Sequence, residues 1–91
     1  MSAPASKLPP ELNDCVNQFL ALANTMHKSF PYDAVSASAL YAAARYNVHG
    51  FVNQDSPGLR DEFLDYMVDL YRRMLVEQLD LQLAEKGATS A

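Results

Sequence analysis

Apolar side chains recur along this chain at steps of three and four residues, the spacing of one face of an α-helix. The first stretch predicts a helix over about residues 10–28, with Pro10 in the first turn, where its missing N–H costs nothing. Phe30-Pro31 should end it, because the residue before a proline is pushed out of the α region. Its predicted apolar face consists of Leu12, Val16, Phe19, Ala23 and Met26.

A second helix is predicted from Asp33 or Ser36 to about Val52, and Ser36 is the candidate N-cap. Most side chains on one face are small and Gly50 borders them, which would let another helix approach closely. Asn47 lies in the middle of this face. We expect a buried amide with satisfied hydrogen bonds there, with a ligand contact as the alternative. The face consists of Leu40, Ala43, Ala44, Asn47 and Phe51.

Ser56-Pro57 is typical of a helix start, and the third predicted helix runs to about Glu85, with Gly87 as its stop. Acidic residues come early in it and basic residues late, which suits the helix dipole. Asp69 and Arg73 form a favourable i, i+4 pair. The apolar arc of this helix is roughly twice the arc of about 100° that one packed neighbour needs.

The third helix is also long, about 40 Å against about 27 Å for the other two at 1.5 Å per residue. The overhang carries Leu79, Leu81 and Leu83, which would form an adhesive patch if left in water. A second copy of the chain is the commonest way to cover such a patch, because one surface then covers its own copy. The alternative is that the chain turns after about Glu77 and the leucines fold back.

Tyr41 and Arg45 form a second candidate surface, at i, i+4 on the flank of the second helix. The guanidinium can stack on the ring. This pair is most often a local surface contact, but Tyr and Arg are also enriched in interaction hot spots.

These helices predict an all-α fold, a three-helix up-down-up bundle with a long C-terminal helix. With 91 residues, the chain is long enough for one domain. We place that domain at residues 9–86, with disordered tails at 1–8 and 87–91.

Charge and composition exclude several partners. The net charge is −4, and the seven Lys and Arg residues are spread along the chain. We therefore expect neither nucleic-acid binding nor attraction to an anionic membrane. No apolar run is long enough to span a bilayer, no secretory leader is visible, and the single cysteine excludes an intramolecular disulfide. The cytoplasm is the expected compartment.

Candidate metal ligands are His27, His49 and a row of carboxylates at i, i+4 and i+8 in the third helix. The third helix lacks the Glu-x-x-His pair of carboxylate-bridged bundle sites, so we expect a solvated acidic face and no metal. The row consists of Asp61, Asp65 and Asp69.

Cys15 is the candidate nucleophile, but His27 lies about 18 Å further along the same helix. We expect Cys15 to be a small core hydrophobe. The three glycines are isolated, so no phosphate-binding loop is expected. No catalytic residue and no cofactor are predicted.

The string Tyr-Ala-Ala-Ala-Arg-Tyr-Asn at residues 41–47, within the stretch 35–47, resembles the central motif of a family of small bacterial proteins catalogued only as a domain of unknown function. Residues 19–24 are also similar, and the resemblance covers roughly residues 15–80. It implies a bacterial source and a compact helical domain, and it supplies no activity, ligand or catalytic residue to carry over. His49-Gly50 departs from the family pattern. Further similar positions are Phe63, Tyr66, Tyr71, Met74, Leu75 and Leu79.

The sequence therefore favours a non-enzymatic protein-protein interaction module that forms a homodimer, with an unidentified protein partner left open. The alternative is a binder of a small apolar ligand in a dimer cleft, and an enzyme or metalloprotein is the third class. The predicted partner-binding residues are Leu79, Leu81, Leu83, Tyr41 and Arg45.

Overall fold

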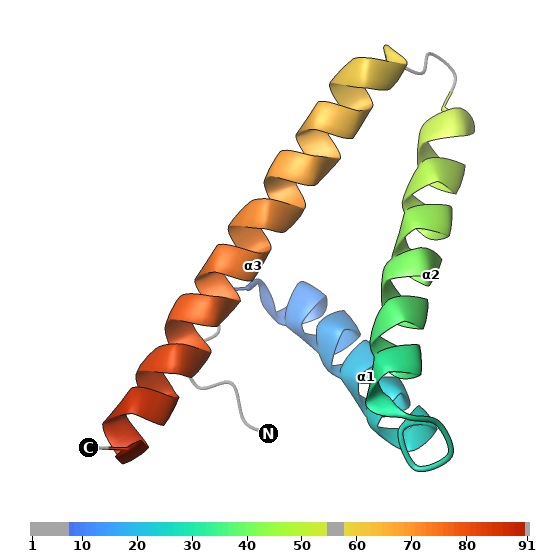
Figure 1. Ribbon diagram of the computed structural model, residues 1–91. Coiled ribbons are helices and arrows are strands. Elements are labelled where there is room, and N and C mark those ends of the chain that lie inside the picture. Colours follow the sequence, from blue (N-terminus) through green and yellow to red (C-terminus); the bar gives the residue numbers. More distant parts are fainter. Residues whose placement is uncertain (1–7, 55–57, 91) are drawn as a thin grey trace. The chain divides into compact units, whose positions relative to one another are not determined.

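The computed structural model describes residues 8–54 and 58–90, and within them it contains three helices and no strand (Figure 1). The helices are α1 (Pro10–Met26), α2 (Tyr32–Val52) and α3 (Arg60–Ser90). The all-α prediction is confirmed, and the up-down-up order stays a prediction. The chain divides into two compact units, Met1–Val48 and His49–Ala91, and the boundary falls inside α2.

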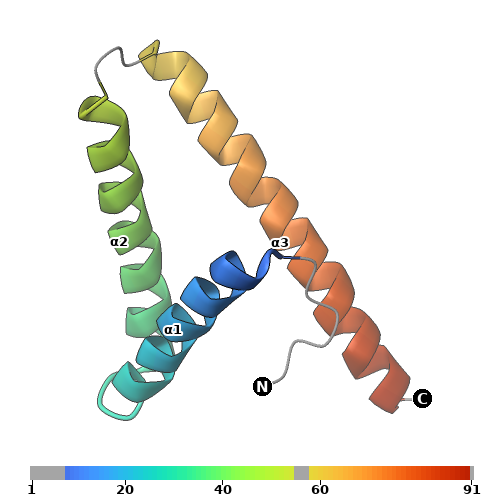
Figure 2. The same cartoon turned by 180° about the vertical axis from the view of Figure 1, so that it is seen from behind.

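α1 begins with Pro10 in its first turn, as predicted. It ends at Met26, slightly earlier than expected, and a short turn follows it (Figure 2). The His27 ring stabilises this turn, because its Nδ1 donates a hydrogen bond of 3.1 Å to the carbonyl oxygen of Phe30. Pro31 then separates α1 from α2, which confirms the predicted stop.

The start of α2 agrees to within one residue with Asp33, one of the two predicted starts, and differs from Ser36, the other. The Pro31 carbonyl accepts hydrogen bonds from the backbone N–H groups of Ala34 and Val35, at 3.1 and 3.2 Å. The helix therefore begins at Tyr32, and Ser36 lies inside it. The N-cap prediction for Ser36 is wrong because the chain turns into the helix immediately after the proline.

The end of α2 at Val52 agrees with the prediction. The side chain of Asn53 closes the last turn, since its Nδ2 donates a hydrogen bond of 2.7 Å to the carbonyl oxygen of His49. The same carbonyl also accepts a hydrogen bond of 3.2 Å from the backbone N–H of Asn53, so both donors of this residue hold the chain at the end of the helix.

Few side chains are buried within the described ranges, and Val35 in α2, at 7% exposure, is the only residue in the buried class. In α1, Val16, Ala23 and Met26 are half-buried, which confirms part of the predicted face. Phe19 was predicted on the same face, but its side chain is 73% exposed. This part of the face is left uncovered.

The prediction of a buried Asn47 is wrong, because Asn47 is exposed. Between Tyr32 and Val52 the formally charged residues are Asp33 and Arg45, so apolar positions surround the helix and their periodicity does not mark one buried side. The face that carries Asn47 is half-buried only at Phe51.

α3 continues to Ser90, so Gly87 does not end it and residues 87–90 of the predicted tail are helical. Gly87 does not adopt the positive φ that a glycine stop requires. The alternative of a turn after Glu77 is therefore wrong. The pair of Asp69 and Arg73 is confirmed, with 3.0 Å between Nε and Oδ2. The predicted start at Ser56-Pro57 lies outside the described residues.

Gly50→Ala is expected to stabilise the protein by about 0.5–1 kcal/mol, or about 2–8 °C in melting temperature. The φ of Gly50 is not positive, and an added Cβ would meet nothing within 4 Å. The alanine therefore gains helix propensity without a clash. Thermal melts followed by circular dichroism measure the change. A lower melting temperature would show that another helix packs closely on this position, as the small residues of α2 suggest.

Candidate interaction surface

Two apolar stripes run along α3, because successive residues are rotated by about 100° in an α-helix. Their centres are separated by roughly a third of a turn. The first, which we call the Phe63 stripe, consists of Phe63, Met67, Leu70, Met74 and Leu81. The second, which we call the Leu75 stripe, consists of Leu64, Val68, Tyr71, Leu75 and Leu79.

The Phe63 stripe is partly covered within the unit that begins at His49. Phe63, Met67 and Leu70 are half-buried. The rings of Phe51 and Phe63 stack with centroids 4.2 Å apart and planes at 25°, which joins the end of α2 to the start of α3. Such a pair contributes about 0.5–1.5 kcal/mol beyond the area that it buries. The two rings flank one short loop, but the periodicity of each helix by itself does not indicate that they pair.

The Leu75 stripe is exposed along its whole length. The exposed fractions are 42% for Leu64, 66% for Val68, 45% for Tyr71, 45% for Leu75 and 56% for Leu79. Single exposed apolar residues are common on protein surfaces, but a contiguous row of five at helical spacing is typical of an interface.

The predicted site residues Leu79, Leu81 and Leu83 are all exposed, at 56%, 39% and 61%. They do not form one patch, because residues two apart on a helix point to different sides. Leu79 continues the Leu75 stripe and Leu83 borders it, whereas Leu81 belongs to the Phe63 stripe. One flat partner surface therefore cannot cover all three leucines.

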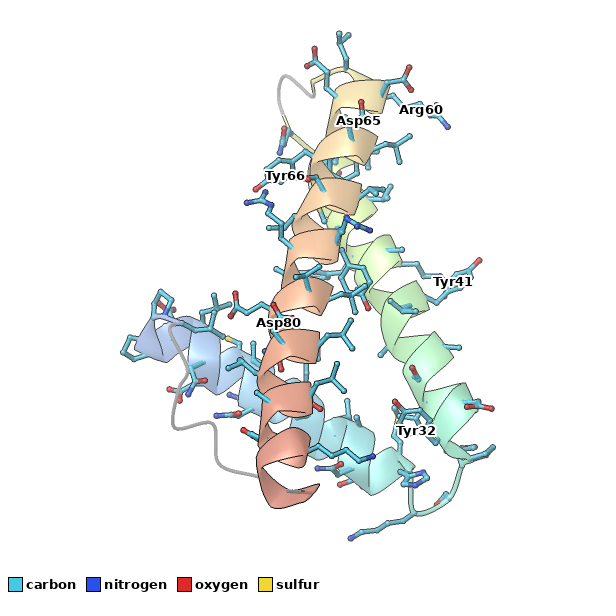
Figure 3. All side chains as sticks on the ribbon, turned by 60° about the vertical axis from the view of Figure 1, so that its left-hand side comes forward. Tyr32, Tyr41, Arg60, Asp65, Tyr66 and Asp80 are labelled. Carbon is cyan, nitrogen blue, oxygen red and sulfur yellow. The ribbon has the colours of Figure 1, made fainter. Side chains whose placement is uncertain are left out.

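The predicted pair on α2 adopts the expected stacked geometry. The guanidinium carbon of Arg45 lies 4.8 Å from the centroid of the Tyr41 ring. Tyr41 is 64% exposed and projects outward from α2 (Figure 3). The stacking holds both side chains in place at the surface. It brings the two side chains close to each other.

Charged side chains line the Leu75 stripe. Asp65 and Arg72 lie along the same edge of this stripe, seven residues or about two helical turns apart. The midpoint of the stripe along the helix axis lies between them. Two ion pairs join Arg60 to Asp61 at 3.3 Å and Arg73 to Asp69 at 3.0 Å, and neither of them includes Asp65 or Arg72. Both pairs are largely exposed, so each contributes little to stability.

The candidate residues for chemistry form no site of their own in the described part of the chain. Among the described residues no group of three or more His, Cys, Asp and Glu side chains could hold a metal ion. His27 and His49 contact neighbours at helix ends, namely the Phe30 carbonyl and the Asn53 amide. Cys15 is exposed, so its prediction as a core residue is wrong. Within the described part of the chain, no helix is long and apolar enough to cross a membrane.

A family model described as "Protein of unknown function (DUF3144)" matches residues 12–82, which include α2 and most of α1 and α3. No curated protein and no solved structure matches the chain.

Proposed function

The chain belongs to the DUF3144 family, whose function is unknown, and we propose that it is a non-enzymatic interaction protein that associates with itself through α3. The partner is a second copy of the chain. The proposal also includes an unidentified protein partner of a different kind, which would bind through Tyr41 and Arg45.

The observation that supports self-association is the exposed Leu75 stripe on a helix that continues to Ser90. Burying one valine or leucine side chain contributes about 1.5–3 kcal/mol. The five side chains of the Leu75 stripe are 42–66% exposed, so each would gain roughly half of this amount in a dimer, and in a two-fold dimer the same row is used twice, which offsets part of the cost of association.

We further propose that the three helices close into an up-down-up bundle in the assembled protein. α2 supports this proposal, because a helix with apolar residues all round is normally covered on several sides. With the Phe63 stripe packed inside such a bundle, the Leu75 stripe is left for the partner chain. The proposal includes neither nucleic acid nor a membrane as a partner.

Sedimentation velocity and multi-angle light scattering on the full chain test the proposal. At tens of micromolar we expect a dimer of about twice the chain mass of 10.1 kDa. The mass should fall on dilution. A folded monomer at this concentration would contradict the proposal, and would mean that the Leu75 stripe is covered within the chain itself.

A further inference from the structure

The Leu75 stripe repeats its own pattern when α3 is reversed. With Leu64 opposite Leu75 of the partner subunit, residue n lies opposite residue 139 minus n. Val68 then lies opposite the partner's Tyr71, and both contacts occur twice around the two-fold axis. The overlap runs from Arg60 to Leu79, about 30 Å of helix.

We propose that α3 pairs with α3 of a second copy in this antiparallel register, and that Asp65 forms an ion pair with Arg72 of the partner subunit on each side of the axis. This inference rests on the proposed function and specifies its surface, its orientation and its polar contacts.

Charge complementarity supports the register. Asp65 and Arg72 lie on the same edge of the Leu75 stripe, and in an antiparallel pair of helices like edges face each other. In this register Asp65 and the partner's Arg72 are offset by two residues, or about 3 Å along the axis, within reach of an arginine side chain. Within one chain the two residues are seven apart, about 10.5 Å along the helix axis, so an ion pair between them in the same chain does not compete with the pair across the dimer.

A parallel arrangement uses the same stripe less well. It would place Arg72 beside Met67 of the partner subunit, without a carboxylate, and Asp65 beside the partner's Arg60, which already contacts Asp61 within its own chain. The antiparallel arrangement therefore gives both Asp65 and Arg72 a partner of opposite charge, whereas the parallel one leaves Arg72 without a partner.

Charge exchange in the full chain tests the register. Asp65→Arg and Arg72→Asp each replace two attractive contacts per dimer with two repulsive ones, and each is expected to raise the dimer dissociation constant about 10–100-fold. The double variant Asp65→Arg/Arg72→Asp restores opposite charges and should return to within about threefold of the unmodified chain. Sedimentation equilibrium measures the constants.

Asp80→Arg is the matched control, because it makes the same change of charge on α3 away from the stripe (Figure 3). It should leave the constant within about twofold of the unmodified chain. If the unmodified chain is a dimer and the double variant has a dissociation constant as high as those of the single variants, the register is wrong and the proposed function stands. If the unmodified chain is a monomer, both fail. Circular dichroism confirms that each variant is folded.

Discussion

Val68→Asp combined with Leu75→Asp is expected to leave the protein a folded monomer at tens of micromolar. Both side chains are exposed within the chain, at 66% and 45%, so the charges need not enter its core. In the dimer that we propose, the two changes remove four apolar side chains, each contributing about 1.5–3 kcal/mol, and add four carboxylates at the same contact. Sedimentation velocity distinguishes the two masses.

The control is Tyr66→Asp combined with Ala84→Asp, which adds the same charge to exposed positions on the side of α3 opposite the Leu75 stripe. It also lowers helix propensity to a similar extent. This control should remain a dimer. If both double variants dissociate, net charge explains the effect and the Leu75 stripe does not. If neither does, the dimer contact lies elsewhere, and the surface of Tyr41 and Arg45 is next to be tested.

Val35→Asp is expected to unfold the unit formed by α1 and most of α2. Val35 is 7% exposed, and a carboxylate in its place would be desolvated. Losing the apolar contact and burying an unpaired polar group together cost about 3–5 kcal/mol. That is a large part of the stability of a small domain, about 5–15 kcal/mol. Thermal melts should show a fall of at least about 12 °C, or no transition.

Val35→Ala and Ala34→Asp calibrate this result. The alanine removes two methyl groups, and we expect it to cost about 1–2 kcal/mol. Ala34 is exposed one position earlier in the same helix turn, so an aspartate there should change stability by less than about 0.5 kcal/mol. If the Val35→Asp and Ala34→Asp proteins have the same melting temperature, Val35 is not part of a core in solution.

The sequence by itself determined the helices and most of their ends. Pro10, Phe30-Pro31 and the apolar spacing of α1 are local signals, and local sterics act on them whatever the rest of the chain does. The i, i+4 pair of Asp69 and Arg73 is also local, since the helix alone brings the two side chains together. The family relationship followed from the residues as well.

The sequence could not determine which sides of the helices are covered. In α2, apolar residues lie all round, so nothing in their spacing distinguished the buried Val35 from the exposed Asn47. In α3, the leucines of the overhang could be separated into two stripes only once the helix was known to continue past Glu77.

The contact between Phe51 and Phe63 likewise depended on the tertiary structure. Helix ends follow from interactions within a few residues. Burial depends on what packs against each face, and in this chain the apolar surface exceeds what one partner helix covers, so packing decides which residues form the core and which remain for another copy.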